Sequence, residues 1–183
     1  MKKFDFMTRD QLTRLHRLGS KRNANRILSD LSQYLQKYSE GHTTVYYLSK
    51  TGREYVDCQK IRKKGHISKH TVMRNEFYLY MGCPAEWKNE VKISDGHGTL
   101  IADSWFKKNG AWNFLEVDLT QTMKENRKKA LIYKGLHDRG AIQQKLGSFP
   151  VVTFLTTTEL RRRQLKEACK TFPSIVYTID DIR

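Results

Sequence analysis

Four carboxylates in the C-terminal half lie in or beside apolar runs that are typical of β-strands, namely Glu90, Asp103, Glu116 and Asp118. In the stretch "NFLEVDLTQ", residues 113–121, strand side chains alternate between two faces, so Glu116 and Asp118 share a face with Phe114. Two carboxylates on one face of a strand form either a solvated surface or a chemical site.

The spacing of Asp103 and Glu116 predicts that these two acids meet. Asp103 lies in "LIADSWF", and Glu116 follows thirteen residues later, beyond a glycine-containing turn. Such segments pair as an antiparallel hairpin. Carboxylate oxygens hold hard cations such as Mg²⁺ or Mn²⁺, which polarise a phosphodiester and lower the pKa of an attacking water. Asp103, Glu116 and Asp118 are therefore candidate metal ligands, with isolated surface acids on strands as the alternative.

The order of these acids resembles the signature of the restriction-endonuclease-like fold, which is an acid, then Asp, then Asp/Glu-x-Lys. Glu90, Asp103 and Glu116 match the three acids, whereas Asp118 stands where that signature has its lysine. The lysine helps to orient water and to neutralise transition-state charge, and an aspartate can do neither. Lys129, on the helical stretch after the strand, could supply the cation; the alternative is a solvated helix charge. The candidate catalytic set is Glu90, Asp103, Glu116 and Lys129.

The elements that must position these acids alternate between strand and helix patterns. The predicted order is strand "NEVKI", strand "LIADSWF", strand "AWNFLEVDL", helix "QTMKENRKKALIYKGLH", strand "FPVVTFLTT", helix "ELRRRQLKEACK" and strand "SIVYTI". This order predicts an α/β sandwich around a mixed sheet, within a chain of α+β or α/β class.

The N-terminal part has the outline of a winged helix-turn-helix. Helical spacing predicts a helix in "TRDQLTRLHRLGS", with Thr8 as N-cap and Gly19 as its end, and a second helix in "KRNANRILSDLSQYLQKY". A turn at Gly41 and a strand at 45–48 then predict the hairpin of a wing. The basic stretch 58–70 is the best candidate linker, so we expect a winged-helix domain at 1–65 and a nuclease-like α/β domain at 66–183.

Candidate DNA contacts follow from side-chain chemistry. Arginine pairs with guanine edges and asparagine with adenine edges in the major groove, whereas cations in the wing and linker hold phosphates. The alternative is a solvated basic helix face. The candidates are Arg22, Asn23, Asn25 and Arg26 on the second helix, Lys50 and Arg53 beside the wing, and Arg62, Lys63 and Lys64 in the linker.

Charge also favours a polyanionic partner. The chain has a formal net charge of +15, and residues 1–75 carry 17 Lys and Arg against 6 Asp and Glu, compared with 17 against 13 in residues 76–183. Double-stranded DNA is therefore the expected partner of the N-terminal part. No apolar run reaches the length of a membrane span or signal peptide, so we expect a cytoplasmic protein without a membrane partner.

Several short motifs occur in the order found in the replication-relaxation family, whose members come from plasmids, conjugative elements and phages. They are "VYYLSKTGREYV", "HTVMRNEFYL", "WKNE", "IADSWF", "FLEVD" and "KKALIYKGL". The resemblance implies a DNA-binding winged helix and a nuclease-like domain that act in replication, mobilisation or their control. It places the family's acids on Glu90, Asp103, Glu116 and Asp118, and its helix lysine and tyrosine on Lys129 and Tyr133. The family pattern ends in E-x-D, so Asp118 is typical there.

The sequence is compatible with three functions. The first is a double-stranded DNA-binding protein of a plasmid or phage with a degenerate nuclease-like domain. The second is a metal-dependent nickase or nuclease that uses Mg²⁺ or Mn²⁺. The third is a phage protein that binds a host replication or transcription factor. Since little chain precedes the first predicted helix, the winged helix is either shortened or completed by a partner, such as a second copy in a homodimer or a replication or mobilisation protein.

Overall fold

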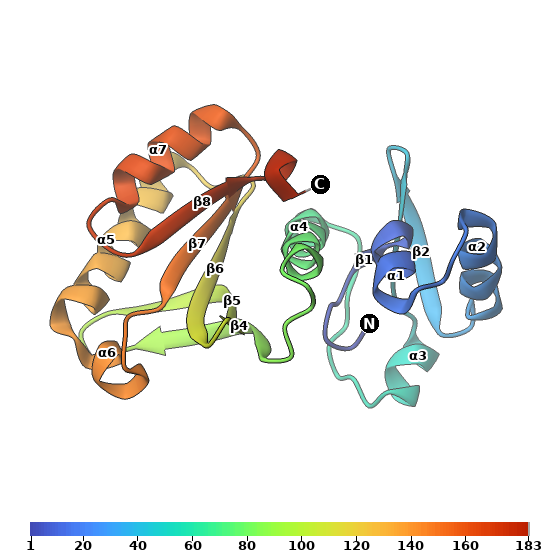
Figure 1. Ribbon diagram of the computed structural model, residues 1–183. Coiled ribbons are helices and arrows are strands. Elements are labelled where there is room, and N and C mark those ends of the chain that lie inside the picture. Colours follow the sequence, from blue (N-terminus) through green and yellow to red (C-terminus); the bar gives the residue numbers. More distant parts are fainter. Residues whose placement is uncertain (183) are drawn as a thin grey trace. The chain divides into compact units, whose positions relative to one another are not determined.

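The strands that carry the acids form a five-stranded sheet in the computed structural model, which describes residues 1–182 (Figure 1). The sheet order is β4-β5-β6-β7-β8, and its strands are β4 (Trp87–Ser94), β5 (Thr99–Lys108), β6 (Ala111–Asp118), β7 (Val151–Thr156) and β8 (Ser174–Thr178). β4, β5 and β6 are antiparallel neighbours, whereas β6, β7 and β8 are parallel. The prediction of a mixed sheet is confirmed.

The two hairpin turns follow from local chemistry. Between β4 and β5, the Asp95 Oδ1 accepts the backbone N–H groups of His97 at 3.0 Å and Gly98 at 2.8 Å. Between β5 and β6, Asn109 and Gly110 both adopt left-handed conformations, with φ of 49° and 79°. Such a pair gives the twist that a two-residue hairpin needs, and it aligns β5 with β6.

The helices α5 (Met123–Arg139), α6 (Ala141–Leu146) and α7 (Glu159–Cys169) lie on one side of this sheet (Figure 1). α5 begins at a capping box, in which Thr122 and Glu125 satisfy each other's backbone N–H groups. Tyr133 and Leu165 are fully buried against the sheet residues Phe114 and Phe154 in one hydrophobic core. This core holds α5 and α7 over β6, where the acids lie. α6 and the final 3₁₀ turn (Ile179–Ile182) were not predicted.

A second, three-stranded sheet belongs to the N-terminal part, in the order β1-β3-β2. Its strands are β1 (Met7–Thr8), β2 (Leu35–Glu40) and β3 (Thr43–Leu48), and the helices beside it are α1 (Arg9–His16), α2 (Lys21–Asp30), α3 (Lys50–Tyr55) and α4 (His66–Tyr80). Thr8 is the N-cap of α1, as predicted, and it forms a capping box with Gln11.

The prediction for residues 31–55 differs from the structure in two elements. The second helix ends at Asp30, and residues 35–40 form β2, which pairs with β3 from Leu35↔Leu48 to Glu40↔Thr43. The ladder satisfies backbone groups that a longer helix would have paired locally, and tertiary pairing here outweighs helical spacing. Residues 50–55, which hold the candidates Lys50 and Arg53 expected beside the wing, form α3, a helix that was not predicted. A side chain at Gly52 would place its Cβ 2.0 Å from the Tyr34 carbonyl oxygen, so this close approach requires glycine.

Helix α4 packs on the N-terminal part through buried amides. The Asn75 Nδ2 donates to the carbonyl oxygens of Phe4 at 2.9 Å and Phe6 at 2.7 Å, and the Gln11 Nε2 donates to that of Val72 at 2.8 Å. Contacts divide the chain into Met1–Leu79 and Tyr80–Arg183, whereas the sequence placed the boundary between residues 65 and 66. Among the described residues, no helix is long and apolar enough to cross a membrane.

Candidate functional site

Glu116 lies on β6 under helix α5 and is only 2% exposed. Its Oε1 accepts a hydrogen bond from the Tyr133 hydroxyl at 2.5 Å, and its Oε2 contacts the Lys129 ammonium. Burial raises the pKa of Glu116 to about 7; Lys129 opposes this shift and Asp103 adds to it. The carboxyl therefore titrates close to neutral pH.

Asp103 lies beside Glu116 because β5 and β6 part at this point. Their pairing runs from Lys108↔Ala111 to Ser104↔Leu115. Beyond it, the Asp103 Oδ2 accepts the backbone N–H of Val117 at 2.7 Å, so a side chain replaces the next ladder bond. The structure thus brings together Asp103, Glu116 and Lys129, three of the predicted site residues.

Asp118 lies on the same face of β6 but in a different environment. It is 1% exposed, and the Arg161 guanidinium of α7 holds both its oxygens, at 2.7 Å and 2.5 Å. Asn126 of α5 and Thr156 of β7 each add a hydrogen bond at 2.8 Å. Burial acts to raise the pKa of Asp118, but the donors Arg161, Asn126 and Thr156 outweigh it and lower the pKa.

These contacts decide whether the acids fit a divalent metal. A carboxylate has about four acceptor positions, and four hydrogen bonds occupy those of Asp118. Glu90, an exposed residue of β4, has a left-handed φ of 54°. Within the described part of the chain, no group of three or more His, Cys, Asp or Glu side chains is arranged to hold a metal ion. The donor set therefore does not fit the expected Mg²⁺ or Mn²⁺ site.

The arrangement of acids instead joins the sheet to its helices. Glu116 connects β6 to α5 through Lys129 and Tyr133, and Asp118 connects β6 to α7 through Arg161. Buried or half-buried charges held by several donors form a specific polar network. Arg161 is a functional candidate that the sequence did not assign to this site; the register Asp118↔Thr156 brings the start of α7 near Asp118.

The candidate base-reading residues lie on α2, and they differ in whether their side chains already form hydrogen bonds within the protein. Asn23 donates its amide N–H to the Leu18 carbonyl oxygen at 2.7 Å, so this group holds the turn between α1 and α2. Arg26 donates to the Asn23 side-chain oxygen at 3.1 Å. Arg22, Asn25 and Arg26 are exposed, and they remain accessible on one surface of the helix.

A groove of about 590 Å³ lies between α2 and the β2–β3 hairpin, and we call it the hairpin groove. Two cations line it, Arg9 and Lys37, together with groups that can donate or accept hydrogen bonds. No carboxylate does so among the described residues. Its lining residues are Arg9, Asn25, Ser29, Lys37, Tyr38, Ser39, Thr44 and Tyr46. The sequence missed Arg9 and Lys37; recognising residues 35–40 as a strand would have placed Lys37 beside the wing.

The remaining candidate DNA-contact residues lie in different elements of the N-terminal part. The Lys64 ammonium lies 5.3 Å from the centre of the Tyr38 ring, at the hairpin groove. Arg62 forms an ion pair with the buried Asp5 at 3.0 Å, which ties the segment after α3 to the N-terminus. Lys50 and Arg53 lie on α3, and Lys63 is exposed. Among these candidates, Lys64 contacts a residue that lines the hairpin groove, Tyr38.

Comparison with known proteins identifies a family. Two solved structures are similar to this chain. One is protein VC1899 from Vibrio cholerae, with 14% sequence identity and a TM-score of 0.42. The other is Can2 from Sulfobacillus thermosulfidooxidans in complex with cyclic tetra-adenylate, with 10% sequence identity and a TM-score of 0.40. They align with 89% and 94% of this chain, which spans only 40% and 46% of theirs, and likenesses this weak carry no argument about function. No curated protein matches. The family model described as replication-relaxation matches residues 1–152, and the chain therefore belongs to the replication-relaxation family.

Proposed function

We propose that this protein binds double-stranded DNA through residues 1–79 and acts in the replication or mobilisation of a plasmid or phage, or in its control. The observation that carries the proposal is the hairpin groove, which combines Arg9 and Lys37 with hydroxyl groups and lies beside the exposed face of α2. The family membership supports a role in replication.

The arrangement of the N-terminal elements supports a winged helix. In that fold, a second helix enters the major groove and a hairpin lies beside it. Here α2 would be the recognition helix and β2–β3 the wing, with α4 supplying the additional helix. Arg22, Asn25 and Arg26 are the exposed candidates for reading bases, since arginine and asparagine make the bidentate contacts that distinguish guanine and adenine.

The hairpin groove supports contact with the phosphate backbone. Phosphate oxygens are bound in most protein–DNA complexes by Lys and Arg together with Ser, Thr, Asn and Tyr side chains, and these residue types line the groove. Arg9 reaches towards Asn25 of α2, with 3.5 Å between the Arg9 Nη1 and the Asn25 Oδ1. One phosphate near Arg9 and Lys37 would therefore lie beside a base-reading residue.

DNA binding is tested by fluorescence anisotropy with a random-sequence duplex at several salt concentrations. We expect the affinity to fall steeply with salt, and we expect Lys37→Ala to reduce the slope of log K against log salt by about one, because one phosphate contact is lost. Lys145→Ala, on the exposed surface of α6, removes the same charge elsewhere and is the matched control. Absence of binding at low salt would refute the proposal and favour a protein that binds a host factor.

For residues 80–183 we propose a nuclease-like domain that acts as an accessory or assembly module without cleaving DNA. The support is that Asp118 carries its own cation, Arg161, and that Lys129 and Tyr133 hold Glu116. Supercoiled plasmid incubated with Mg²⁺ or Mn²⁺ should stay intact. Nicking by the wild type that disappears in a double variant, Asp103→Ala with Glu116→Ala, would instead establish the nickase, with Asp103, Glu116 and Lys129 as its site.

A further inference from the structure

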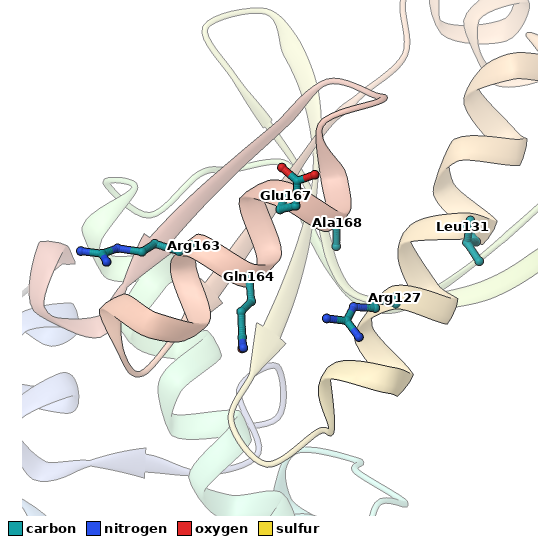
Figure 2. Close-up of a pocket in the computed structure, with 6 residues that line it drawn as sticks. All are labelled: Arg127, Leu131, Arg163, Gln164, Glu167 and Ala168. Atoms are coloured by element: carbon teal, nitrogen blue, oxygen red, sulfur yellow. The ribbon is translucent and has the colours of Figure 1, made fainter.

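A second groove, in residues 80–183, lies between helices α5 and α7 and has a volume of about 510 Å³ (Figure 2). We call it the α5–α7 groove. Arg127 and Gln164 extend into the space between the two helices, whereas Arg163 points away from α5 (Figure 2). Its lining residues are Arg127, Leu131, Arg163, Gln164, Glu167 and Ala168.

The α5–α7 groove exposes apolar surface. Leu131 and Ala168 are its two apolar lining residues among those described, and the Leu131 side chain is 66% exposed. Leu160, one helical turn before Gln164 on α7, is also 66% exposed. A single exposed leucine is ordinary, but Leu131 lines a groove, where an apolar group that covers it would gain free energy.

The surroundings of the groove are positively charged. Within residues 1–182, neither Arg127 nor Arg163 forms an ion pair with a carboxylate, and the one acid in the lining, Glu167, is paired with Lys170 at 2.5 Å. α5 carries six Lys and Arg against two Asp and Glu, and α7 carries four against two. The groove therefore offers the Arg127 guanidinium beside exposed apolar surface, and Arg163 adds a second guanidinium on the side of α7 that faces away from α5.

We propose that the α5–α7 groove docks an acidic segment of a partner protein. A large apolar side chain of that segment packs on Leu131 and Ala168, while flanking carboxylates pair with Arg127 and Arg163. Charge complementarity selects the acidic partner, and arginine suits carboxylates because its fork of N–H groups binds both oxygens. An amphipathic segment laid into a groove is a common mode of peptide recognition.

The lining argues for a protein rather than a nucleic acid. Phosphate contacts use hydroxyl and amide donors as well as cations, and none of the described lining residues carries a hydroxyl group. A phosphate gains nothing from Leu131, whereas an apolar side chain does. The proposal concerns residues 123–169 alone, so it stands or falls independently of DNA binding by residues 1–79.

The first experiment identifies a probe by selecting a random-peptide display library on the full-length protein, with counter-selection on the Leu131→Gln variant. Glutamine keeps the length and helix propensity of this exposed position while removing its apolar surface. We expect enriched peptides to combine Asp or Glu with a Leu, Phe or Trp. Failure to enrich any sequence, or enrichment of basic peptides, overturns the proposal.

The second experiment measures the affinity of an enriched peptide by fluorescence anisotropy. Arg127→Glu and Leu131→Gln should each weaken binding about tenfold or more, and Lys88→Glu, an equal charge change on exposed β4, should weaken it less than twofold. Circular dichroism checks that each variant is folded. Equal weakening by Lys88→Glu would mean unspecific charge attraction. Binding that a DNA duplex displaces fully and that Leu131→Gln leaves unchanged would assign the groove to nucleic acid; either result overturns the proposal.

Discussion

Glu116 and Asp118 are two residues apart on one face of β6, and both are almost fully buried, yet the pKa values of their carboxyl groups are shifted in opposite directions. Burial raises the pKa of Glu116 to about 7, whereas the pKa of Asp118 is lowered. The number of donors differs: one ammonium and one hydroxyl reach Glu116, whose neighbour Asp103 is itself an acid, whereas a bidentate guanidinium, an amide and a hydroxyl reach Asp118. Burial alone therefore does not set the charge of a strand carboxylate; its partners do.

The difference also separates two roles on one strand. The lowered pKa keeps Asp118 negatively charged at neutral pH, and Arg161 neutralises this charge, so Asp118 behaves as a fixed connection between β6 and α7. Glu116 can gain or lose a proton near neutral pH, so its contact with Lys129 changes with conditions.

Removing Asp118 should have the largest effect. Asp118→Ala leaves the half-buried Arg161 without its partner and Asn126 and Thr156 without their acceptor, and we expect a loss of about 3–5 kcal/mol in the free energy of unfolding. Urea denaturation followed by circular dichroism measures it. Asp138→Ala breaks an exposed ion pair with Lys134 and is the matched control. Equal losses in the two variants would show that Asp118 is no stronger a connection than a surface pair.

The pH dependence of stability should show the second effect. Because the folded-state pKa of Glu116 is raised from 4.5 to about 7, its protonated form stabilises the fold below pH 4.5, and this stabilisation is lost as the pH rises through 7. The shift corresponds to about 3 kcal/mol. Glu116→Gln mimics the protonated state, so its stability relative to the wild type should rise between pH 4 and pH 8.

The matched variant for this titration is Asp118→Asn. The pKa of Asp118 is lowered, so its contribution is present above pH 3.8 and is lost as the pH falls through the folded-state pKa. At neutral pH the free energy of unfolding of Asp118→Asn should therefore be lower than that of the wild type, whereas that of Glu116→Gln should be higher. Parallel pH profiles for the two variants would contradict the contrast between the two acids.

The Tyr133 hydroxyl should have the smallest effect. Tyr133→Phe removes the hydrogen bond to Glu116 while keeping the buried ring, and we expect a loss of about 1–2 kcal/mol in the free energy of unfolding at pH 8. The pKa of Glu116 should also rise, because the lost hydrogen bond favours the charged form. NMR titration of the Glu116 carboxyl measures this shift, and Tyr55→Phe, at an exposed hydroxyl, is the control. An unchanged pKa would remove Tyr133 from the network.

The proximity of Asp103 and Glu116 could be predicted from the sequence because it depends on local geometry. Strand alternation assigned the face, and the length of the hairpin assigned the pairing. Lys129 is likewise predicted as the cation on the helical stretch after the strand, and in the structure it contacts Glu116.

The partners of Asp118 could not be predicted in this way. Arg161 is 43 residues away along the chain, and it reaches Asp118 only because β7 lies parallel to β6 and α7 follows β7 directly. In the N-terminal part, Leu35 fits the apolar spacing of a helix as well as the alternation of a strand. Pairing with β3 decides between them, and that information is not local.

The contacts of Asn75 have a consequence for how the protein folds during its synthesis. Its amide holds the carbonyl oxygens of Phe4 and Phe6, which are 71 and 69 residues earlier in the chain. Chains emerge from the ribosome N-terminus first, so the Phe6 carbonyl oxygen, directly before β1, can pair with Asn75 only after α4 has emerged. In the first 65 residues alone, the Phe4 carbonyl oxygen keeps the backbone N–H of Phe6, but the Phe6 carbonyl oxygen lacks its Asn75 donor, so the N-terminal unit is completed when the helix after the linker has emerged.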